Sequence, residues 1–218
     1  MTDNSNIKAD FWEAAWTNNR TGWDLGGPTP ALLSLLRSHQ SDLFPSQQEA
    51  FTVLIPGVGR GYDVVAFAAK PGVKAIGWIS AKPLGVTEAK KELARANLST
   101  DRAEVILADF FEYTSAPFNV VFDHTFLCAI HPSLRKQWGA KMAELTKKDG
   151  YLICYMFPLR EPDENGPPYA LSIELYLELL GESFERVLQR DLEVSELPTS
   201  GMDRDKLGKQ MISLWKRR

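Results

Sequence analysis

Three glycines at alternating positions constrain the possible fold of this chain more than any other feature of its sequence. A short apolar run, residues 53–55, leads into Gly57, Gly59 and Gly61, and an apolar helix-like segment, residues 63–69, follows. This order predicts a strand, a tight turn and a helix. In parallel α/β sheets such a turn brings backbone N–H groups close to a nucleotide-like ligand. The segment therefore indicates a cofactor-binding loop.

One usual component of such a loop is missing. In dinucleotide-binding units an acidic side chain stands about 20 residues beyond the first glycine and binds the ribose hydroxyls. Here residues 64–87 contain neither Asp nor Glu, and Trp78 stands near the end of the second predicted strand. We expect the lost hydrogen bond and the bulk of Trp78 to weaken cofactor binding.

Length and charge limit the classes of function. The 218 residues fit one domain, residues 1–218, and the net charge of −3 gives no electrostatic footprint for nucleic acid. The N-terminal residues are polar, and no apolar run is long enough to span a bilayer. We therefore expect a cytoplasmic protein that binds a small molecule, with no nucleic-acid or membrane partner. The sequence does not determine its oligomeric state.

The cysteines and histidines do not indicate a metal site. Cys128 and Cys154 each lie within an apolar run, which is typical of buried, reduced thiols. The histidines, His39, His124 and His131, form no cluster with metal-ligand spacing. We expect no bound metal.

Strands and helices are predicted to alternate along most of the chain. Short β-branched or aromatic runs predict strands at residues 51–55, 74–79, 104–108, 118–122 and 151–157. Helical periodicity predicts helices at residues 63–69, 84–96 and 133–147, the last stopped by Gly150. This alternation predicts an α/β fold with a doubly wound, mostly parallel sheet whose ligand lies at the carboxyl ends of the strands.

The last third of the chain departs from this alternation. Residues 159–169 are rich in turn residues and long enough to form a binding loop. A helix at residues 172–180 is predicted next, and residues 184–192 and 212–216 suit an antiparallel pair at the edge of the sheet.

Several short motifs, in order, resemble one family. They lie at residues 11–16, 22–24, 56–63, 108–111, 123–135, 166–169 and 215–216. Together they resemble the thiopurine methyltransferase-like family of S-adenosylmethionine enzymes, especially its thiol and halide methyltransferase branch. The resemblance covers nearly the whole chain and implies a seven-stranded, Rossmann-like class I methyltransferase fold. It also implies S-adenosyl-L-methionine as the cofactor and a small thiol or halide as the substrate.

The resemblance assigns roles to individual residues. Asp109 would bind the adenine amino group, Asp123 and Thr125 would lie near the sulfonium, and Tyr169 would contact the substrate. The remaining cofactor residues implied are three tryptophans and three glycines of the loop: Trp12, Trp16, Trp23, Gly57, Gly59 and Gly61. These assignments agree with simple chemistry, because aromatic faces stabilise a cation and a carboxylate accepts hydrogen bonds from an amine.

Departures from the family pattern leave two alternatives open. Trp78 replaces the acid of the second strand, Val58 replaces a cysteine of the loop, and His124 and His131 are also unusual. The scaffold could instead serve as an isomerase, cyclase or lyase with weak or no cofactor binding. His124 would then be the acid–base group, its protonated form favoured by the charge of Asp123. The other alternative is a binding module without catalysis.

Overall fold

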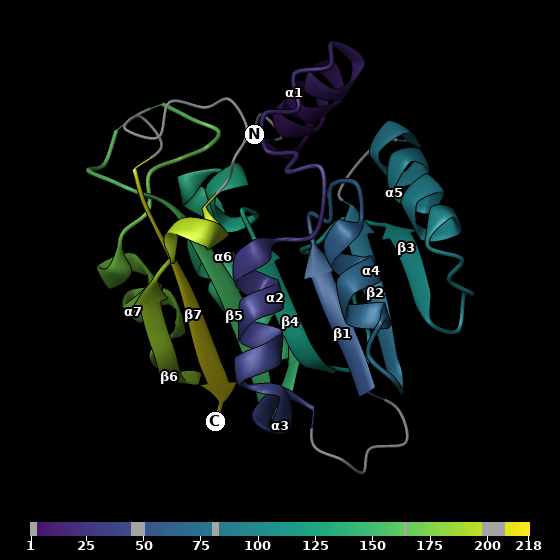
Figure 1. Ribbon diagram of the computed structural model, residues 1–218. Coiled ribbons are helices and arrows are strands. Elements are labelled where there is room, and N and C mark those ends of the chain that lie inside the picture. Colours follow the sequence, from purple (N-terminus) through teal and green to yellow (C-terminus); the bar gives the residue numbers. More distant parts are fainter. Residues whose placement is uncertain (1–3, 45–50, 80–82, 164, 198–207) are drawn as a thin grey trace.

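The computed structural model describes residues 4–44, 51–79, 83–163, 165–197 and 208–218. Within these residues a single sheet of seven strands has the order β3-β2-β1-β4-β5-β7-β6 (Figure 1). The strands are β1 (Phe51–Pro56), β2 (Val73–Ile79), β3 (Ala103–Leu107), β4 (Phe118–His124), β5 (Thr146–Leu159), β6 (Phe184–Asp191) and β7 (Lys209–Arg217).

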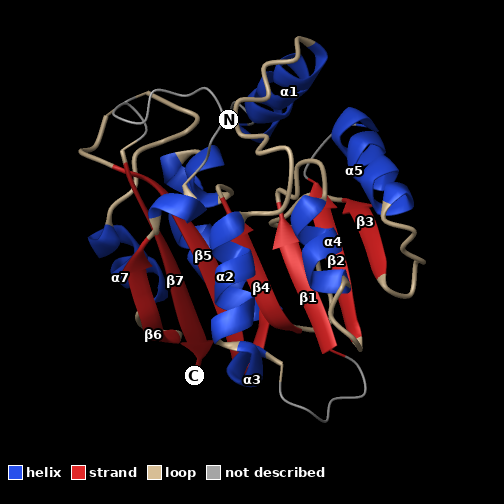
Figure 2. Cartoon of the chain, in the orientation of Figure 1, coloured by secondary structure: helices blue, strands red, loops and turns tan. Residues whose placement is uncertain are grey.

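Helices cover both faces of the sheet. The α-helices are α1 (Asn4–Thr17), α2 (Pro30–Ser38), α3 (Gln40–Leu43), α4 (Tyr62–Ala68), α5 (Pro83–Arg95), α6 (Arg135–Leu145) and α7 (Ile173–Leu180). The described residues also form the short 3₁₀ helices η1 (Leu127–Ala129), η2 (Pro132–Leu134) and η3 (Val194–Glu196). Figure 2 shows α2 and α4 in front of the sheet, and α1 beyond the carboxyl ends of the strands.

The pairing of the strands creates a topological switch point. β1 pairs in parallel with β2 on one side and with β4 on the other, and β2–β3 and β4–β5 are also parallel. Because the chain winds outward in both directions from β1 and β4, the loops that follow these two strands diverge and leave a crevice at their carboxyl ends. β7 is antiparallel to both β5 and β6.

Two hydrophobic clusters hold the layers together. One joins the sheet to α2, α3, α4 and α5, with Leu32, Leu35 and Phe67 among its fully buried members. The other lies on the opposite face against α6 and α7, and is centred on large side chains such as Trp138 and Tyr176. Successive residues of a strand supply the two clusters in turn, as Val53 and Leu54 do, because side chains alternate across a sheet.

The predicted doubly wound α/β sheet is confirmed, including the antiparallel pair formed by β6 and β7. The predicted end of the helix at residues 133–147 is wrong, since α6 ends at Leu145 and Thr146 already pairs with Phe118 of β4. Gly150 lies within β5, where a Cβ atom would approach the carbonyl oxygen of Asn119 to 2.7 Å. Glycine is therefore required there for close contact between strands, not for a helix stop.

Two helical glycines give a matched test of this packing. A Cβ at Gly139 of α6 would lie 2.6 Å from the backbone oxygen of Leu179, whereas one at Gly85 of α5 would meet no atom of the described residues closer than 3.6 Å. Alanine gains at most about 1 kcal/mol of helix propensity at either position, but overpacking against backbone costs about 1–3 kcal/mol. Urea unfolding should show Gly139→Ala destabilised by about 1–2 kcal/mol and Gly85→Ala neutral or slightly stabilised. Equal effects at both positions would contradict the close approach of α6 and α7.

Candidate active site

The glycine loop between β1 and α4 forms the floor of the site. Gly57 and Gly59 have φ angles of 65° and 55°, in the left-handed region that favours glycine. Among the described residues, a Cβ at Gly59 would have only the Trp23 indole nitrogen within 4 Å, at 4.0 Å. A Cβ at Gly57 would lie 2.9 Å from the ring of Phe126. The backbone at Gly59 is therefore open to a ligand, whereas Gly57 allows the loop to pack closely on Phe126.

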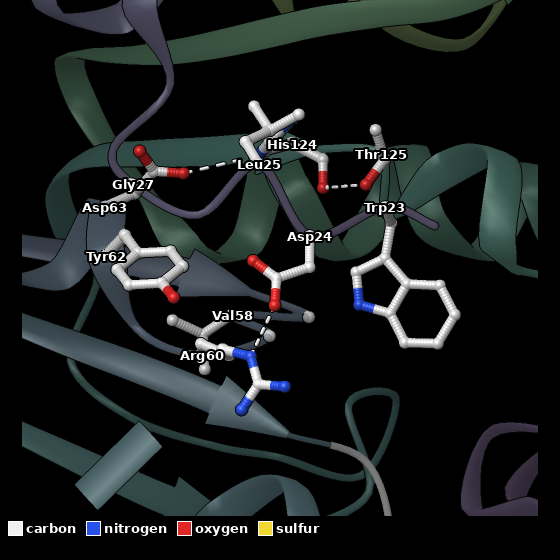
Figure 3. Close-up of a pocket in the computed structure, with 12 residues that line it drawn as sticks. Trp23, Asp24, Leu25, Gly27, Val58, Arg60, Tyr62, Asp63, His124 and Thr125 are labelled. Carbon is white, nitrogen blue, oxygen red and sulfur yellow. Dashed lines mark hydrogen bonds and ion pairs between the residues drawn. The ribbon is translucent and has the colours of Figure 1, made fainter. Parts of the chain in front are cut away.

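A hollow of about 410 Å³, including space open to solvent, lies above this loop. In Figure 3, Trp23 and Thr125 lie on one side of it, Tyr62 and Asp63 on the other, and Asp24 between them. The lining residues are Trp23, Asp24, Leu25, Gly27, Gly57, Val58, Gly59, Arg60, Tyr62, Asp63, His124 and Thr125.

The three predicted tryptophans form one aromatic cluster. The ring of Trp23 meets those of Trp12 and Trp16 edge to face, with centroids 5.1 and 5.7 Å apart. Trp23 alone among them lines the hollow, and Trp12 and Trp16 on α1 pack against it from outside. The cluster thus fixes the position of the indole that lines the hollow.

Arg60 connects the loop to its neighbours. Its guanidinium donates hydrogen bonds to the carboxylates of Asp24 and Glu88, the latter at 2.7 Å, and it lies 5.1 Å from the centroid of the Trp16 ring. The hydrogen bond to Asp24 is the main cause that raises the pKa of Arg60. With two carboxylates compensating its charge, Arg60 holds the wall of the hollow together.

Asp123 points away from the hollow. It is fully buried, and its oxygens accept hydrogen bonds from the backbone N–H groups of Phe126 and Leu127 and, at 2.9 Å, from the indole of Trp138. Burial raises the pKa of this carboxyl group to about 6, although the three donors lower it. Its observed contacts stabilise the turn after β4, and a direct role in binding the sulfonium stays a prediction.

His124, the next residue of β4, lines the hollow and contacts a different carboxylate from the one expected. Its Nδ1 lies 3.2 Å from Oδ2 of Asp63 and 3.1 Å from Oγ1 of Thr29. The charges of Asp123 and His124 interact, but neighbouring residues of a strand point to opposite faces, and the direct contact of the imidazole is with Asp63. Asp63 is therefore the carboxylate in contact with the imidazole of His124.

Two further predicted residues, Asp109 and Trp78, do not line the hollow. Asp109, beyond the end of β3, is exposed, and its Oδ1 accepts a hydrogen bond from the N–H of Phe111. The Trp78 indole is 0% exposed and meets Phe110 and Phe126 edge to face, with no hydrogen-bond partner for its nitrogen among the described residues. The bulk of Trp78 therefore lies in the core, not in the hollow. Residues 80–82, next to the expected ribose acceptor, lie outside the described residues.

Of the remaining predicted residues, Thr125 lines the hollow, whereas Gly61 and Tyr169 do not. Thr125 lines it in a left-handed conformation, with φ of 59°, and its hydroxyl donates a hydrogen bond to the carbonyl of His124. Gly61 is buried, where a Cβ would meet Leu93 of α5 at 3.2 Å. Tyr169 does not line the hollow; its N–H donates to the carbonyl oxygen of Cys128, at 2.8 Å. A substrate contact by Tyr169 stays a prediction.

Three polar side chains of the site were missed in the sequence. Asp24, Arg60 and Asp63 all line the hollow, and all lie within or beside the motifs that carried the family resemblance. Their positions in those motifs could have identified them as residues of the site. Their contacts could not be predicted from the sequence, because Asp63 and His124 are 61 residues apart and Arg60 and Asp24 are 36 apart.

Neither a metal-binding cluster nor a membrane-spanning helix is present among the described residues. Their His, Cys, Asp and Glu side chains form no group that could hold a metal ion. No helix in the described part of the chain has the length and apolar character that a membrane span requires. Cys128 and Cys154 are free and buried, and burial raises the pKa of both thiols, which keeps them protonated.

The sheet order and the hollow at its switch point define the fold of a class I methyltransferase. A Burkholderia thailandensis 1,6-didemethyltoxoflavin-N1-methyltransferase, with bound S-adenosylhomocysteine, superimposes with a TM-score of 0.71 at 20% identity, covering 97% of this chain and 87% of that one. The magnesium protoporphyrin IX methyltransferase of Synechocystis PCC 6803, with bound SAM, gives 0.70 at 13% identity, covering 100% and 99%.

The sequence identifies the family to which the chain belongs. The family model described as thiopurine S-methyltransferase (TPMT) matches residues 7–217, and the chain belongs to this family. A probable thiol methyltransferase 2 of Arabidopsis thaliana is 35% identical over 211 residues, covering 96% of this chain and 86% of the relative. Thiocyanate methyltransferase 1 of Brassica oleracea is 32% identical over 216 residues, covering 97% and 86%. The protein is an S-adenosyl-L-methionine-dependent methyltransferase that acts on a small-molecule nucleophile.

The buried carboxyl group of Asp123 makes stability depend on pH. Its folded pKa of about 6 lies above the ordinary value of 3.8. Its contribution to stability is therefore fully present below about pH 4 and is lost as the pH rises through 6. One pKa unit corresponds to about 1.4 kcal/mol, so the stability of the wild type relative to Asp123→Asn should fall by about 3 kcal/mol across this window.

Urea unfolding of both proteins between pH 4 and pH 8 measures this difference. Trp138→Phe offers a second variant, since it removes one donor to the carboxylate and should move the decline toward higher pH. Parallel stability curves for the wild type and Asp123→Asn would show that ionisation of this carboxylate costs nothing in the folded state.

Proposed function

We propose that the protein transfers the methyl group of S-adenosyl-L-methionine to a small thiol, thiocyanate or halide. One observation carries the proposal: the hollow at the switch point combines an open glycine backbone with an indole and is lined by Trp23, Gly57, Gly59 and Thr125. The similarity to thiol and thiocyanate methyltransferases over nearly the whole chain supports the same substrate class.

The residues present fit the cofactor at several points. The backbone at Gly59 would support its methionine part, because a Cβ there would project into open space. The Trp23 indole would face the sulfonium, and such a contact contributes about 0.5–2 kcal/mol when water is excluded. The exposed carboxylate of Asp109 would accept a hydrogen bond from the adenine amino group. When bound, the cofactor supplies the methyl group.

The protein would contribute to catalysis mainly by positioning the two reactants and excluding water. A thiolate, thiocyanate or halide is already nucleophilic, so its methylation requires no catalytic triad. Holding two reactants in line can supply about 7–11 kcal/mol toward the barrier. The Trp23 cluster and the Arg60 ion pairs would fix the walls between which the reactants meet. The two free, buried thiols also fit a cytoplasmic location.

Two glycines with the same backbone strain test the cofactor site. Gly59 and Gly72 both have positive φ angles, 55° and 74°, and a Cβ at Gly72 would meet no atom of the described part of the chain within 4 Å. Alanine should therefore cost each variant a similar amount of stability. We expect Gly59→Ala to lose at least tenfold in affinity for S-adenosylhomocysteine, about 1.4 kcal/mol, because its methyl group occupies ligand space. Gly72→Ala should bind like the wild type in calorimetric titration.

Product analysis tests the reaction itself. The wild type should convert iodide, thiocyanate or an alkyl thiol to its methyl derivative, detected by gas chromatography, only when S-adenosyl-L-methionine is added. Binding of the cofactor without methylation of any of these nucleophiles would contradict the proposed substrate class. Equal loss of affinity in Gly59→Ala and Gly72→Ala would place the cofactor elsewhere.

A further inference from the structure

We propose that His124 is the general base that deprotonates a thiol substrate, held in position by Asp63. This assignment rests on the proposed function and narrows it, because only a nucleophile that carries a proton needs a base. The chain would therefore be adapted to neutral thiols, while halide and thiocyanate would react without help from His124.

The hydrogen bonds around His124 determine which ring nitrogen carries the proton. The Thr29 hydroxyl donates to Oδ2 of Asp63 at 2.9 Å, so its hydrogen is not available to the imidazole. Nδ1 of His124 lies near two oxygens, Oδ2 of Asp63 and Oγ1 of Thr29, and satisfies both contacts only as an N–H donor. The neutral ring then has its lone pair on Nε2.

Nε2 is the nitrogen left for a substrate. Among the described residues it makes no hydrogen bond, and the side chain of His124 retains 17% exposure at the wall of the hollow beside Thr125 (Figure 3). A ring nitrogen with no hydrogen-bond partner among the described residues, on a side chain that lines the hollow, is available to accept a proton from a ligand.

The surroundings of the ring fix its orientation. The ring of Phe122 stacks on it with centroids 5.8 Å apart, and that of Tyr155 meets it edge to face at 4.8 Å. Burial raises the pKa of Tyr155, whose hydroxyl donates to Gln210, so this neighbour remains neutral. Asp63 is the carboxylate that contacts the imidazole, and it stabilises the imidazolium formed when Nε2 takes a proton.

The proposed step balances without a further reactant. The S–H bond of the thiol breaks, an N–H bond forms at Nε2 of His124, and the electron pair remains on sulfur. The thiolate would form an S–C bond to the methyl group as the C–S bond of the sulfonium breaks and its electron pair goes to the leaving sulfur, which becomes an uncharged thioether. The imidazolium gives its proton to water. An alkyl thiol is mostly protonated at neutral pH, so a positioned base contributes about 10²-fold or more to its rate.

The test compares two classes of nucleophile in one variant. His124→Asn removes Nε2 but places an amide N–H where Nδ1 now donates to Asp63, so the contact between β4 and α4 is kept. We expect kcat/KM for an alkyl thiol such as 2-mercaptoethanol to fall about 10²-fold or more, while kcat/KM for iodide stays within about threefold of the wild type. An aryl thiol that is already ionised at neutral pH should behave like iodide.

His39→Asn is the matched control, because His39 lies at the end of α2, hydrogen-bonds Ser38 and does not line the hollow. It should leave both activities unchanged. A readout without turnover uses the thiol with S-adenosylhomocysteine in place of the methyl donor. The ultraviolet absorbance of a bound thiolate should appear with the wild type and be lost in His124→Asn.

The outcomes separate the two proposals. Equal loss of thiol and iodide methylation in His124→Asn, or full retention of both, overturns the role of His124 and leaves the proposed function standing. Absence of cofactor-dependent methylation of both nucleophiles by the wild type overturns the proposed function and this assignment with it. A thiol-specific loss together with loss of the thiolate absorbance supports the base.

Discussion

The carboxylate of Asp63 connects three segments that are far apart in the sequence. From the first turn of α4 it accepts hydrogen bonds from the N–H and the hydroxyl of Thr29, before α2, and it contacts His124 at the end of β4. Both residues that it holds are at or beside the hollow. The walls of the site therefore share one buried anchor, and the loss of either partner would leave a carboxylate that is costly to bury.

Much of the fold follows from the order of residues along the chain. The alternation of apolar runs with helical segments was sufficient for the parallel sheet, because each pattern has its own period and short connections leave few topologies. Gly150 shows where prediction from the sequence alone fails. A glycine after a helix is typical of a C-cap, but here it permits a close contact with the carbonyl of Asn119. Only the tertiary structure reveals that neighbour.

The sequence was sufficient to predict where the site lies, but not which contacts its side chains make. Trp23, Gly57, Gly59, His124 and Thr125 were all expected at the ligand and all line the hollow. Asp123 and Trp78 were expected there too, yet both side chains are buried in the core. Adjacent strand residues point to opposite faces, so Asp123 and His124 cannot both face the same partner. Family motifs give positions along the chain, whereas this alternation decides which side chain reaches the ligand.

The place of β7 in the sheet affects the order in which the protein can form during synthesis. β7 follows every other described strand in the sequence, yet it lies between β5 and β6 and contributes the buried side chains Ile212, Leu214 and Trp215. Until it emerges from the ribosome, β5 has an unpaired edge and β6 has no partner strand. The nascent chain thus carries an open sheet edge, the kind of surface on which chaperones act, until its final strand is inserted.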